Sequence, residues 1–473
     1  MARFLDLPLE VLPLILRHIL RPNHLAALCL VDHYFRAFAI PLLYEHAFIY
    51  AWQKEAKAKV KKLFRTLSDH PTLASHVKRL VICDFPKALQ SADQENVLDI
   101  CLRGIINCVN LKSCTWTRDG SLTSSVLEAL LFCTQLKELE INGSHHGRYD
   151  PSILARFSRL RKITLIMPSS AVINTLPCWM RYTGDTLRHL SLICKSPAAV
   201  TDTLLEMLAP HISKLEHLYL AGCRKVTERG VLAILAASEN GLLSLGLEGI
   251  SDHFDMKHLS EQCARTGALV HLRSITLAAR MAPESIVHAA ARRTHWWDTD
   301  VLALLAPAPL EQFHMSTIGG EIEPTLSDVF CHAIVKVHGL RLRRFSIHRM
   351  PVSLSAIADV CHCCPLLEQL FVVMDQDALD ELGPCLAEAH RLRTVHVNRP
   401  LLTSGDAPVV SSELILSLVR QCPPTLTHFG SNTRVYQVER VPIVEEDGTI
   451  TIDVRLSSYE SPEVPEQFLV VRM

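Results

Sequence analysis

Two short segments carry residue types that do chemistry in many proteins. Cys361-His362-Cys363-Cys364 offers thiol and imidazole ligands of the kind that bind zinc, and Glu445-Glu446 offers paired carboxylates suited to acid–base work. A zinc site needs a second ligand pair at short spacing, and none accompanies Cys361 to Cys364 in the sequence. Glu445 and Glu446 precede an Asp-Gly turn signal, where solvated charge is usual. We therefore expect no metal, no cofactor and no catalytic residue at either segment.

The common catalytic motifs are missing from the sequence. It contains no phosphate loop, no dinucleotide-binding glycine pattern, no zinc-protease helix and no nucleophile elbow. A catalytic thiol would need neighbours that lower its pKa, and the sequence identifies none around any of the 16 cysteines. In a chain without signal-peptide features, these cysteines are expected to be reduced and buried. We expect a protein that binds other molecules and is not itself an enzyme.

Charge and hydropathy exclude several classes of partner. Lysine plus arginine total 48 and aspartate plus glutamate total 49, so no global charge favours nucleic acid or membrane surfaces. Asp6 and Glu10 interrupt any signal peptide, and no uncharged apolar run reaches the length of about 18 residues that a transmembrane helix needs. We expect no nucleic-acid partner, no membrane partner and a cytoplasmic or nuclear location, or both. The locally basic residues 51–70 indicate a solvated helix that joins two domains, with Val60, Leu63, Phe64 and Leu67 facing inward, and a contact with nucleic acid or lipid is the alternative.

A leucine-spaced unit repeats along most of the chain. The unit is L-x-x-L-x-L, and thirteen copies recur about every 29 residues, usually with a helical segment between them. This pattern resembles the leucine-rich repeat, in which a strand and a helix alternate and neighbouring units share one core. The expected fold is an α/β leucine-rich-repeat solenoid shaped as a curved horseshoe. The copies begin at Val77, Leu111, Leu136, Leu160, Leu187, Leu215, Leu242, Leu272, Leu310, Leu342, Leu367, Leu392 and Leu426.

Cysteines just before several strands indicate a subtype of repeat. Cys108, Cys133, Cys364 and Cys422 each end a predicted helix, and Cys223 follows Leu218-Tyr-Leu-Ala-Gly. The pattern resembles the cysteine-containing class of leucine-rich repeat. Proteins of that class often carry an F-box and recruit substrates to ubiquitin ligases. A small, weakly polar thiol packs well where a helix meets a strand.

Residues 7–44 form an apolar helical segment of a different kind. Leu-Pro opens it, apolar residues follow at spacings of three and four, and Arg21-Pro22-Asn23 interrupts it, with Asn23 as the expected N-cap of the next helix. So short a segment cannot bury its apolar surface alone. It resembles the F-box, in the form common in fungal proteins. The resemblance implies that the segment docks on a Skp-family adaptor and, through it, on a cullin-RING scaffold.

These patterns divide the chain into four parts. We expect a small three-helix F-box at 1–48, a helical linker at 49–76, the solenoid at 77–432, and a C-terminal β-hairpin cap or tail at 433–473. The resemblance implies a non-catalytic substrate-recognition subunit of a Skp-cullin-F-box ubiquitin ligase, which directs its target to proteasomal degradation. The residues expected on the adaptor face are Leu7, Pro8, Val11, Ile15, Leu20, Leu25, Leu28 and Val31.

The alternating residues of each repeat strand should face the concave side of the solenoid and contact the target. The later strands are richer in histidine and arginine, which favours an acidic or phosphorylated target segment, with Arg344 and His348 as contacts. Two alternatives remain open: a scaffold outside the ubiquitin system, and a small-molecule receptor under an insertion at 278–309. The candidate target-binding residues are His189, His217, Tyr219, His314, Arg344, His348, Phe371, His396, Trp296 and Trp297.

Overall fold

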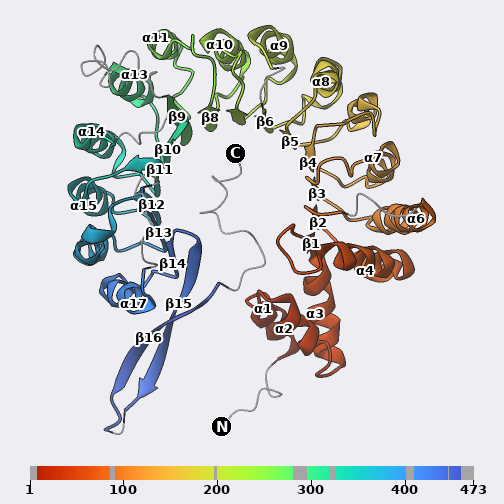
Figure 1. The fold of residues 1–473 in the computed structure, drawn as a ribbon, viewed down its shortest axis with the longest axis horizontal. Helices are drawn as coiled ribbons and strands as arrows, with labels where there is room; N and C mark the ends of the chain where they lie inside the picture. Colours follow the sequence, from red (N-terminus) through yellow and green to blue (C-terminus); the bar gives the residue numbers. More distant parts are fainter. Residues whose placement is uncertain are drawn as a thin grey trace. The chain divides into compact units, whose positions relative to one another are not determined.

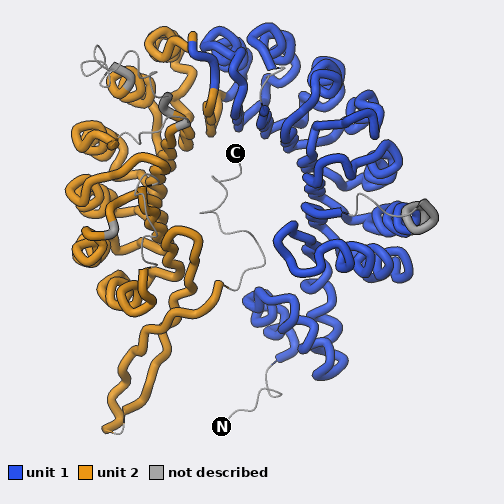
Figure 2. Tube along the Cα trace, in the orientation of Figure 1, with its two compact units in different colours: residues 1–240, 250–252 blue, residues 241–249, 253–473 orange. Residues whose placement is uncertain are grey.

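The computed structural model describes residues 8–85, 91–195, 200–280, 296–318, 325–400, 410–445 and 447–459. At 91–96, 279–280, 296–297 and 376 it describes the backbone only. The chain divides into two compact units, coloured separately in Figure 2. Unit 1 comprises residues 1–240 and 250–252, and unit 2 comprises residues 241–249 and 253–473.

Unit 1 begins with an N-terminal helical segment, residues 8–45. It contains the 3-10 turn η2 (Leu9–Val11) and the helices α1 (Leu12–Leu16), α2 (Pro22–Leu28) and α3 (His33–Glu45). Asp32 caps α3 by accepting hydrogen bonds from Tyr34 N at 2.7 Å and Phe35 N at 2.9 Å. The expectation that Asn23 caps α2 is wrong. Arg21 is the N-cap, because Pro22 has the fixed φ that suits the first helical position and starts the helix two residues earlier than expected.

The rest of unit 1 alternates strands and helices (Figure 1). Its strands pair in parallel with the next strand along the chain, from β1 through to β7. They are β1 (His46–Ile49), β2 (Arg79–Ile82), β3 (Ser113–Trp116), β4 (Glu138–Asn142), β5 (Lys162–Ile166), β6 (His189–Ile193) and β7 (His217–Ala221). The helices are α4 (Ala56–Asp69), α5 (Pro71–Ala74), α6 (Ser91–Asn107), α7 (Ser124–Leu131), η3 (Pro151–Arg156), α8 (Ser170–Thr183), α9 (Asp202–Leu208), η4 (Ala209–His211) and α10 (Glu228–Ala237).

Unit 2 continues the same alternation and then changes direction. Strands β8 to β14 run parallel, whereas β15 and β16 form an antiparallel hairpin on the edge of β14. The strands are β8 (Ser244–Glu248), β9 (Ser274–Arg280), β10 (Gln312–Ile318), β11 (Arg344–Pro351), β12 (Gln369–Val373), β13 (Thr394–Asn398), β14 (His428–Ser431), β15 (Arg434–Val444) and β16 (Ile450–Ser458). The helices are α11 (Met256–Thr266), α13 (Trp296–Leu305), α14 (Asp328–His338), α15 (Leu354–Cys363), η6 (Gln376–Glu381), α16 (Leu382–Ala387) and α17 (Ser412–Gln421).

The core of each unit lies between the strands and the helices. In β5 the repeat residues Ile163 and Leu165 are fully buried, and α8 lays Leu176 and Trp179 against this layer. The Trp179 indole N–H donates to the Phe157 carbonyl at 3.0 Å, so its polar edge is satisfied inside the core. The alternate apolar residues of each repeat strand, such as Ile163 and Leu165, therefore point toward the helices. The residues between them point to the opposite side of the strands, called here the helix-free face.

Asp202 joins two neighbouring repeats through three hydrogen bonds, of which the one to Gly230 is buried. Its Oδ1 accepts from Thr227 N at 2.8 Å and Gly230 N at 3.2 Å, and its Oδ2 accepts from the Thr227 hydroxyl at 2.7 Å. Thr227 in turn caps α10, and Thr201 caps α9. The caps of adjacent helices are therefore held in one network.

The fold class expected from the sequence, an α/β leucine-rich-repeat architecture with a β-rich C-terminal tail, is confirmed. Each of the thirteen leucine-spaced segments contains a strand, and Gly448 forms the hairpin turn with φ of 82°. One strand was not expected: β1 pairs with β2, so the parallel run begins at His46, upstream of residue 77. Across the described residues, the helices are too short or too polar to cross a lipid bilayer.

Candidate functional site

The N-terminal helical segment has a small core of its own. Leu12, Leu16, Leu25, Phe35 and Ala39 are buried together where α1 and α2 pack on α3. These residues follow the spacings of three and four seen in the sequence. The contacts that hold the three helices together therefore bury only part of the apolar surface of this segment.

Many of the remaining apolar residues of this segment are exposed. Leu30 is 88% exposed, Val31 60% and Leu20 51%, although side chains of this type usually leave water. They lie in the connections at the two ends of α2. Exposed apolar residues gathered on one small segment are typical of a protein-binding surface. The set, called here the apolar helical surface, is Leu9, Leu14, Ile15, Leu20, Leu30, Val31 and Tyr34.

The structure separates the residues expected to contact an adaptor into three groups. Pro8, Ile15, Leu20 and Val31 are exposed, while Val11 and Leu28 are half-buried. Leu25 lies in the core, because its position on α2 points toward α3, so it holds the helices together. Leu7 lies outside the described residues. The residues expected on the adaptor face did not include Leu9, Leu14 or Leu30, although their apolar type was a usable signal.

On the helix-free face of unit 1, β6 and β7 bring two predicted residues together. His189 and His217 are register partners, and their rings stack with centroids 3.8 Å apart and planes 5° apart. Burial lowers the pKa of His189 to about 4, assisted by His217 and Lys162. Burial also lowers the pKa of His217, opposed by Glu216 and assisted by Lys162. Both imidazoles are therefore neutral at pH 7.

His189, His217 and Glu216 place three possible metal ligands within 4.8 Å of one another. Their surroundings do not favour a cation. The two rings are parallel, so their nitrogen lone pairs run side by side and do not converge on one point. Arg188 forms an ion pair with Glu216 at 3.5 Å, and Lys162 lies close enough to act on both histidines. We assign no metal to this cluster.

On the helix-free face of unit 2, a polar network runs across three strands. The Glu248 carboxylate of β8 accepts from the Ser316 hydroxyl at 3.2 Å and lies 3.9 Å from His314 Nε2. His314 Nδ1 lies 2.8 Å from Ser346 Oγ, which lies 3.0 Å from His348 Nε2. Burial lowers the pKa of His314 far below its usual range. Burial, together with His396 and two arginines, lowers the pKa of His348 to about 3. The network therefore runs between buried, neutral imidazoles.

Aromatic and backbone contacts enclose this network. The Arg344 guanidinium lies 4.7 Å from the centroid of Phe371, and the Phe371 and His348 rings lie 6.3 Å apart. His396 Nε2 lies 2.9 Å from the Asn432 carbonyl oxygen. Gly430, the register partner of His396 on β14, leaves the space that the imidazole fills. These side chains form a packed layer on the helix-free face.

Most of the predicted target-binding residues of unit 2 therefore lie close together, but neighbouring side chains bury them. His314, His348, Phe371 and His396 are all buried, and Phe371 is 0% exposed. The sequence placed them on the correct side of their strands but did not indicate burial, because it does not show how neighbouring strands stack their side chains. Arg344 is half-buried in unit 2, and His189, His217 and Tyr219 are half-buried in unit 1. The side chains of Trp296 and Trp297 lie outside the described atoms.

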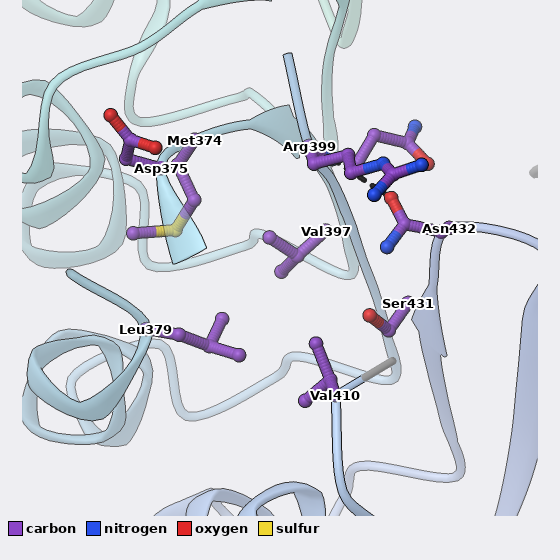
Figure 3. Close-up of a pocket in the computed structure, with 9 residues that line it drawn as sticks. Met374, Asp375, Leu379, Val397, Arg399, Val410, Ser431 and Asn432 are labelled. Carbon is purple, nitrogen blue, oxygen red and sulfur yellow. Dashed lines mark hydrogen bonds between the residues drawn. The ribbon is translucent and has the colours of Figure 1, made fainter. Parts of the chain in front are cut away.

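A small pocket lies at the carboxyl ends of β12, β13 and β14 (Figure 3). Met374, Leu379 and Val397 line one part, and Arg399 lies beside Asn432, whose side-chain oxygen accepts from Arg399 N at 2.9 Å. Its space is about 190 Å³, including solvent at its mouth. Small-molecule sites usually enclose about 300–1,000 Å³. Residues 281–295 of the 278–309 insertion, the predicted alternative ligand site, lie outside the described residues.

The cysteine-rich segment at 361–364 does not gather its ligands. Cys361 and Cys364 are buried, whereas Cys363 is exposed. His362 points to Glu388, with His362 Nδ1 2.9 Å from a carboxylate oxygen. Burial raises the pKa of the Cys364 thiol to about 12, so it stays protonated and packs as an apolar group.

Comparison with known proteins identifies no close relative. No protein-family model matches the chain, and a search of curated proteins finds no match. One similar solved structure is the leucine-rich-repeat-containing protein LegL7 from Legionella pneumophila, with 11% identity and a TM-score of 0.35, covering 66% of this chain and 90% of that one. Another is the complex of Rad7 and Elc1 in yeast, with 14% identity and a TM-score of 0.41, covering 80% of this chain and 88% of that one. Because both TM-scores are low, neither similarity identifies a family or a function for this chain.

Proposed function

We propose that this chain is a non-catalytic, substrate-recruiting subunit of a ubiquitin ligase. The N-terminal helical segment docks on a Skp-family adaptor, and the repeat strands carry the target. The adaptor holds the chain on a cullin-RING scaffold, so that target lysines are kept near a charged ubiquitin-conjugating enzyme. The mechanism is tethering, which raises the effective concentration of the two reactants.

The observation that carries the proposal is the apolar helical surface. The segment satisfies its own core with Leu12, Leu16, Leu25, Phe35 and Ala39, yet leaves Leu30 and Val31 more than half exposed. Burying one such side chain contributes about 1.5–3 kcal/mol. A partner that covered several of them would gain enough free energy for stable docking.

Target binding is assigned to the helix-free face, with unit 1 as the more accessible part. His189, His217 and Tyr219 are half-buried on β6 and β7, whereas the corresponding residues of unit 2 are packed in the polar network. A half-buried aromatic or imidazole side chain keeps an edge for a partner while being held in place by its neighbours. Accessibility therefore supports the β6–β7 strands and the half-buried Arg344 as the first places to look for target contacts, ahead of the buried His348.

The docking proposal is tested by co-purification of the full chain with a Skp-family adaptor. Replacing Leu30 and Val31 together with glutamate puts two charges on the apolar helical surface. Because both side chains are exposed, the helices should still fold. We expect adaptor binding to weaken at least 30-fold, equal to about 2 kcal/mol.

The matched control replaces Val329 and Leu340 of unit 2 with glutamate, since each is 79% exposed. That variant should bind the adaptor as the unchanged chain does. If the Leu30/Val31 variant retains full affinity, docking does not use this surface. If the unchanged chain binds no Skp-family adaptor, the ligase proposal fails and a scaffold outside the ubiquitin system takes its place.

A further inference from the structure

Two of the 16 cysteines face each other across neighbouring repeats. Cys194 follows β6 and Cys223 lies just beyond β7, and their sulfur atoms are 3.7 Å apart. Cys108, Cys133, Cys364 and Cys422, in contrast, lie buried where a helix ends. This pair plays no part in adaptor docking or in the target contacts proposed above.

The backbone holds both cysteines in place. Cys194 N donates to the Ala221 carbonyl at 2.7 Å, continuing the parallel pairing of β6 with β7. Cys223 Sγ lies 3.6 Å from the Ala221 carbonyl oxygen and 3.8 Å from that of Leu192. A disulfide bond is about 2.05 Å long, so the sulfurs must approach by about 1.7 Å for the bond to form.

The two thiols differ in a way that suits stepwise oxidation. Cys194 is partly exposed, whereas Cys223 is fully buried. A hydrogen bond from the Cys223 thiol to the Cys194 sulfur lowers the pKa of Cys194, although burial works against it. The same bond, together with burial, raises the pKa of Cys223 well above its usual value. The reachable sulfur is thus also the one that more readily becomes a thiolate.

We propose that Cys194 and Cys223 are a redox pair, in which a peroxide oxidises Cys194 and Cys223 then closes a reversible disulfide between β6 and β7. In the first step the Cys194 thiolate attacks one oxygen of the peroxide. The O–O bond breaks, Cys194 becomes a sulfenic acid, and the departing hydroxide takes a proton to become water.

In the second step the Cys223 sulfur attacks the Cys194 sulfur. The S–S bond forms, the S–O bond breaks, and the hydroxide that leaves takes the Cys223 proton as water. Two thiols and one hydrogen peroxide give one disulfide and two waters. A dithiol reductant reverses the change by thiol–disulfide exchange.

The bond would restrain the repeats that carry the half-buried histidines. The two cysteines are 29 positions apart in sequence, so the closed loop contains the whole of α9 and β7. His189 and His217 lie at the opposite ends of the same two strands. Oxidation would therefore stiffen this part of unit 1 without occupying its helix-free face.

Peptide mapping of the unchanged full-length protein tests the proposal. The protein is treated with hydrogen peroxide, blocked with N-ethylmaleimide and digested with trypsin without reductant. Cys194 lies in the tryptic peptide 189–195 and Cys223 in 215–224, and each peptide holds one cysteine. We expect these two peptides to appear as one linked species that dithiothreitol separates, with a mass about 2 Da below their sum.

Cys178, which is exposed, reports that the peroxide dose is sufficient. In the variant Cys223→Ser the linked species should vanish, and dimedone should capture a sulfenic acid on Cys194. The proposal is overturned if Cys194 remains as open to N-ethylmaleimide as in untreated protein at a dose that oxidises Cys178. It is also overturned if Cys194 is linked to a cysteine other than Cys223.

Discussion

His189 stacks directly on His217 across β6 and β7, with 3.8 Å between the ring centroids. Neighbouring parallel strands bring equivalent side chains this close at each step, and two neutral rings tolerate the contact. Lys162, the register partner of His189 on β5, extends the row with a fixed positive charge. A positive charge on either imidazole would therefore weaken the stack.

Replacing His217 with arginine should destabilise the protein by placing a charge in the stack. Arginine places a permanent charge beside Lys162 and against the His189 ring, whereas His217→Gln keeps the position neutral. Because the site is half-exposed, we expect a loss of at most about 1 kcal/mol, visible as a lower melting temperature in low salt and largely restored in high salt. Equal melting temperatures for the arginine and glutamine variants at both salt concentrations would contradict this account.

His348 predicts a specific dependence of stability on pH. Its folded pKa is about 3, while an unfolded chain has a histidine pKa of about 6.5. Between these two pH values the unfolded state binds more protons than the folded state. The contribution of neutral His348 to folding stability is therefore complete above pH 6.5 and is lost as the pH falls toward 3. The loss is roughly 1.4 kcal/mol for each pH unit and each such histidine.

Urea unfolding measured from pH 7.5 to pH 4.5 checks this dependence. The variant His348→Gln should show a shallower fall in unfolding free energy with acid than the unchanged protein. The control His362→Gln alters an exposed ring on α15 and should leave the slope unchanged. Identical slopes for all three proteins would show that His348 is not held neutral by its surroundings.

We predict that Asp202 stabilises the contact between the repeats that contain α9 and α10. The variant Asp202→Ala removes the acceptor for the buried Gly230 N–H and for the partly buried Thr227 N–H and Thr227 hydroxyl. Each unsatisfied buried donor costs about 1–3 kcal/mol, so we expect a loss of at least about 2 kcal/mol in unfolding free energy. Ser417→Ala, which removes an exposed hydroxyl from α17, is a mild control. A loss no larger than the control's would mean that water replaces the carboxylate.

The sequence predicts the positions of the strands well, but it predicts poorly which side chains of the helix-free face are exposed. The spacing of Leu187, Leu190 and Leu192 directly reports which side chains face the helices, so the position of β6 follows from it. The burial of His348 depends on Ser346 beside it and on Phe371 and His396, which lie 23 and 48 positions further along the chain on other strands. No local pattern records that packing. The contact between Cys194 and Cys223 was invisible for the same reason.

β1 was missed for a related reason. Residues His46–Ile49 are only four, and they follow the long apolar helix α3 without a leucine-spaced signature. Their strand character comes from the free edge of β2, which supplies hydrogen-bond partners to the backbone. Short strands of this kind are determined by the neighbour they join.

The reversal of direction at β15 limits how this protein can lengthen. Asn432, with φ of 51°, turns the chain back so that β15 runs antiparallel along β14. A new strand–helix repeat added after β14 would find its hydrogen-bonding edge occupied. Repeats that lengthen the parallel array must therefore be added before β14.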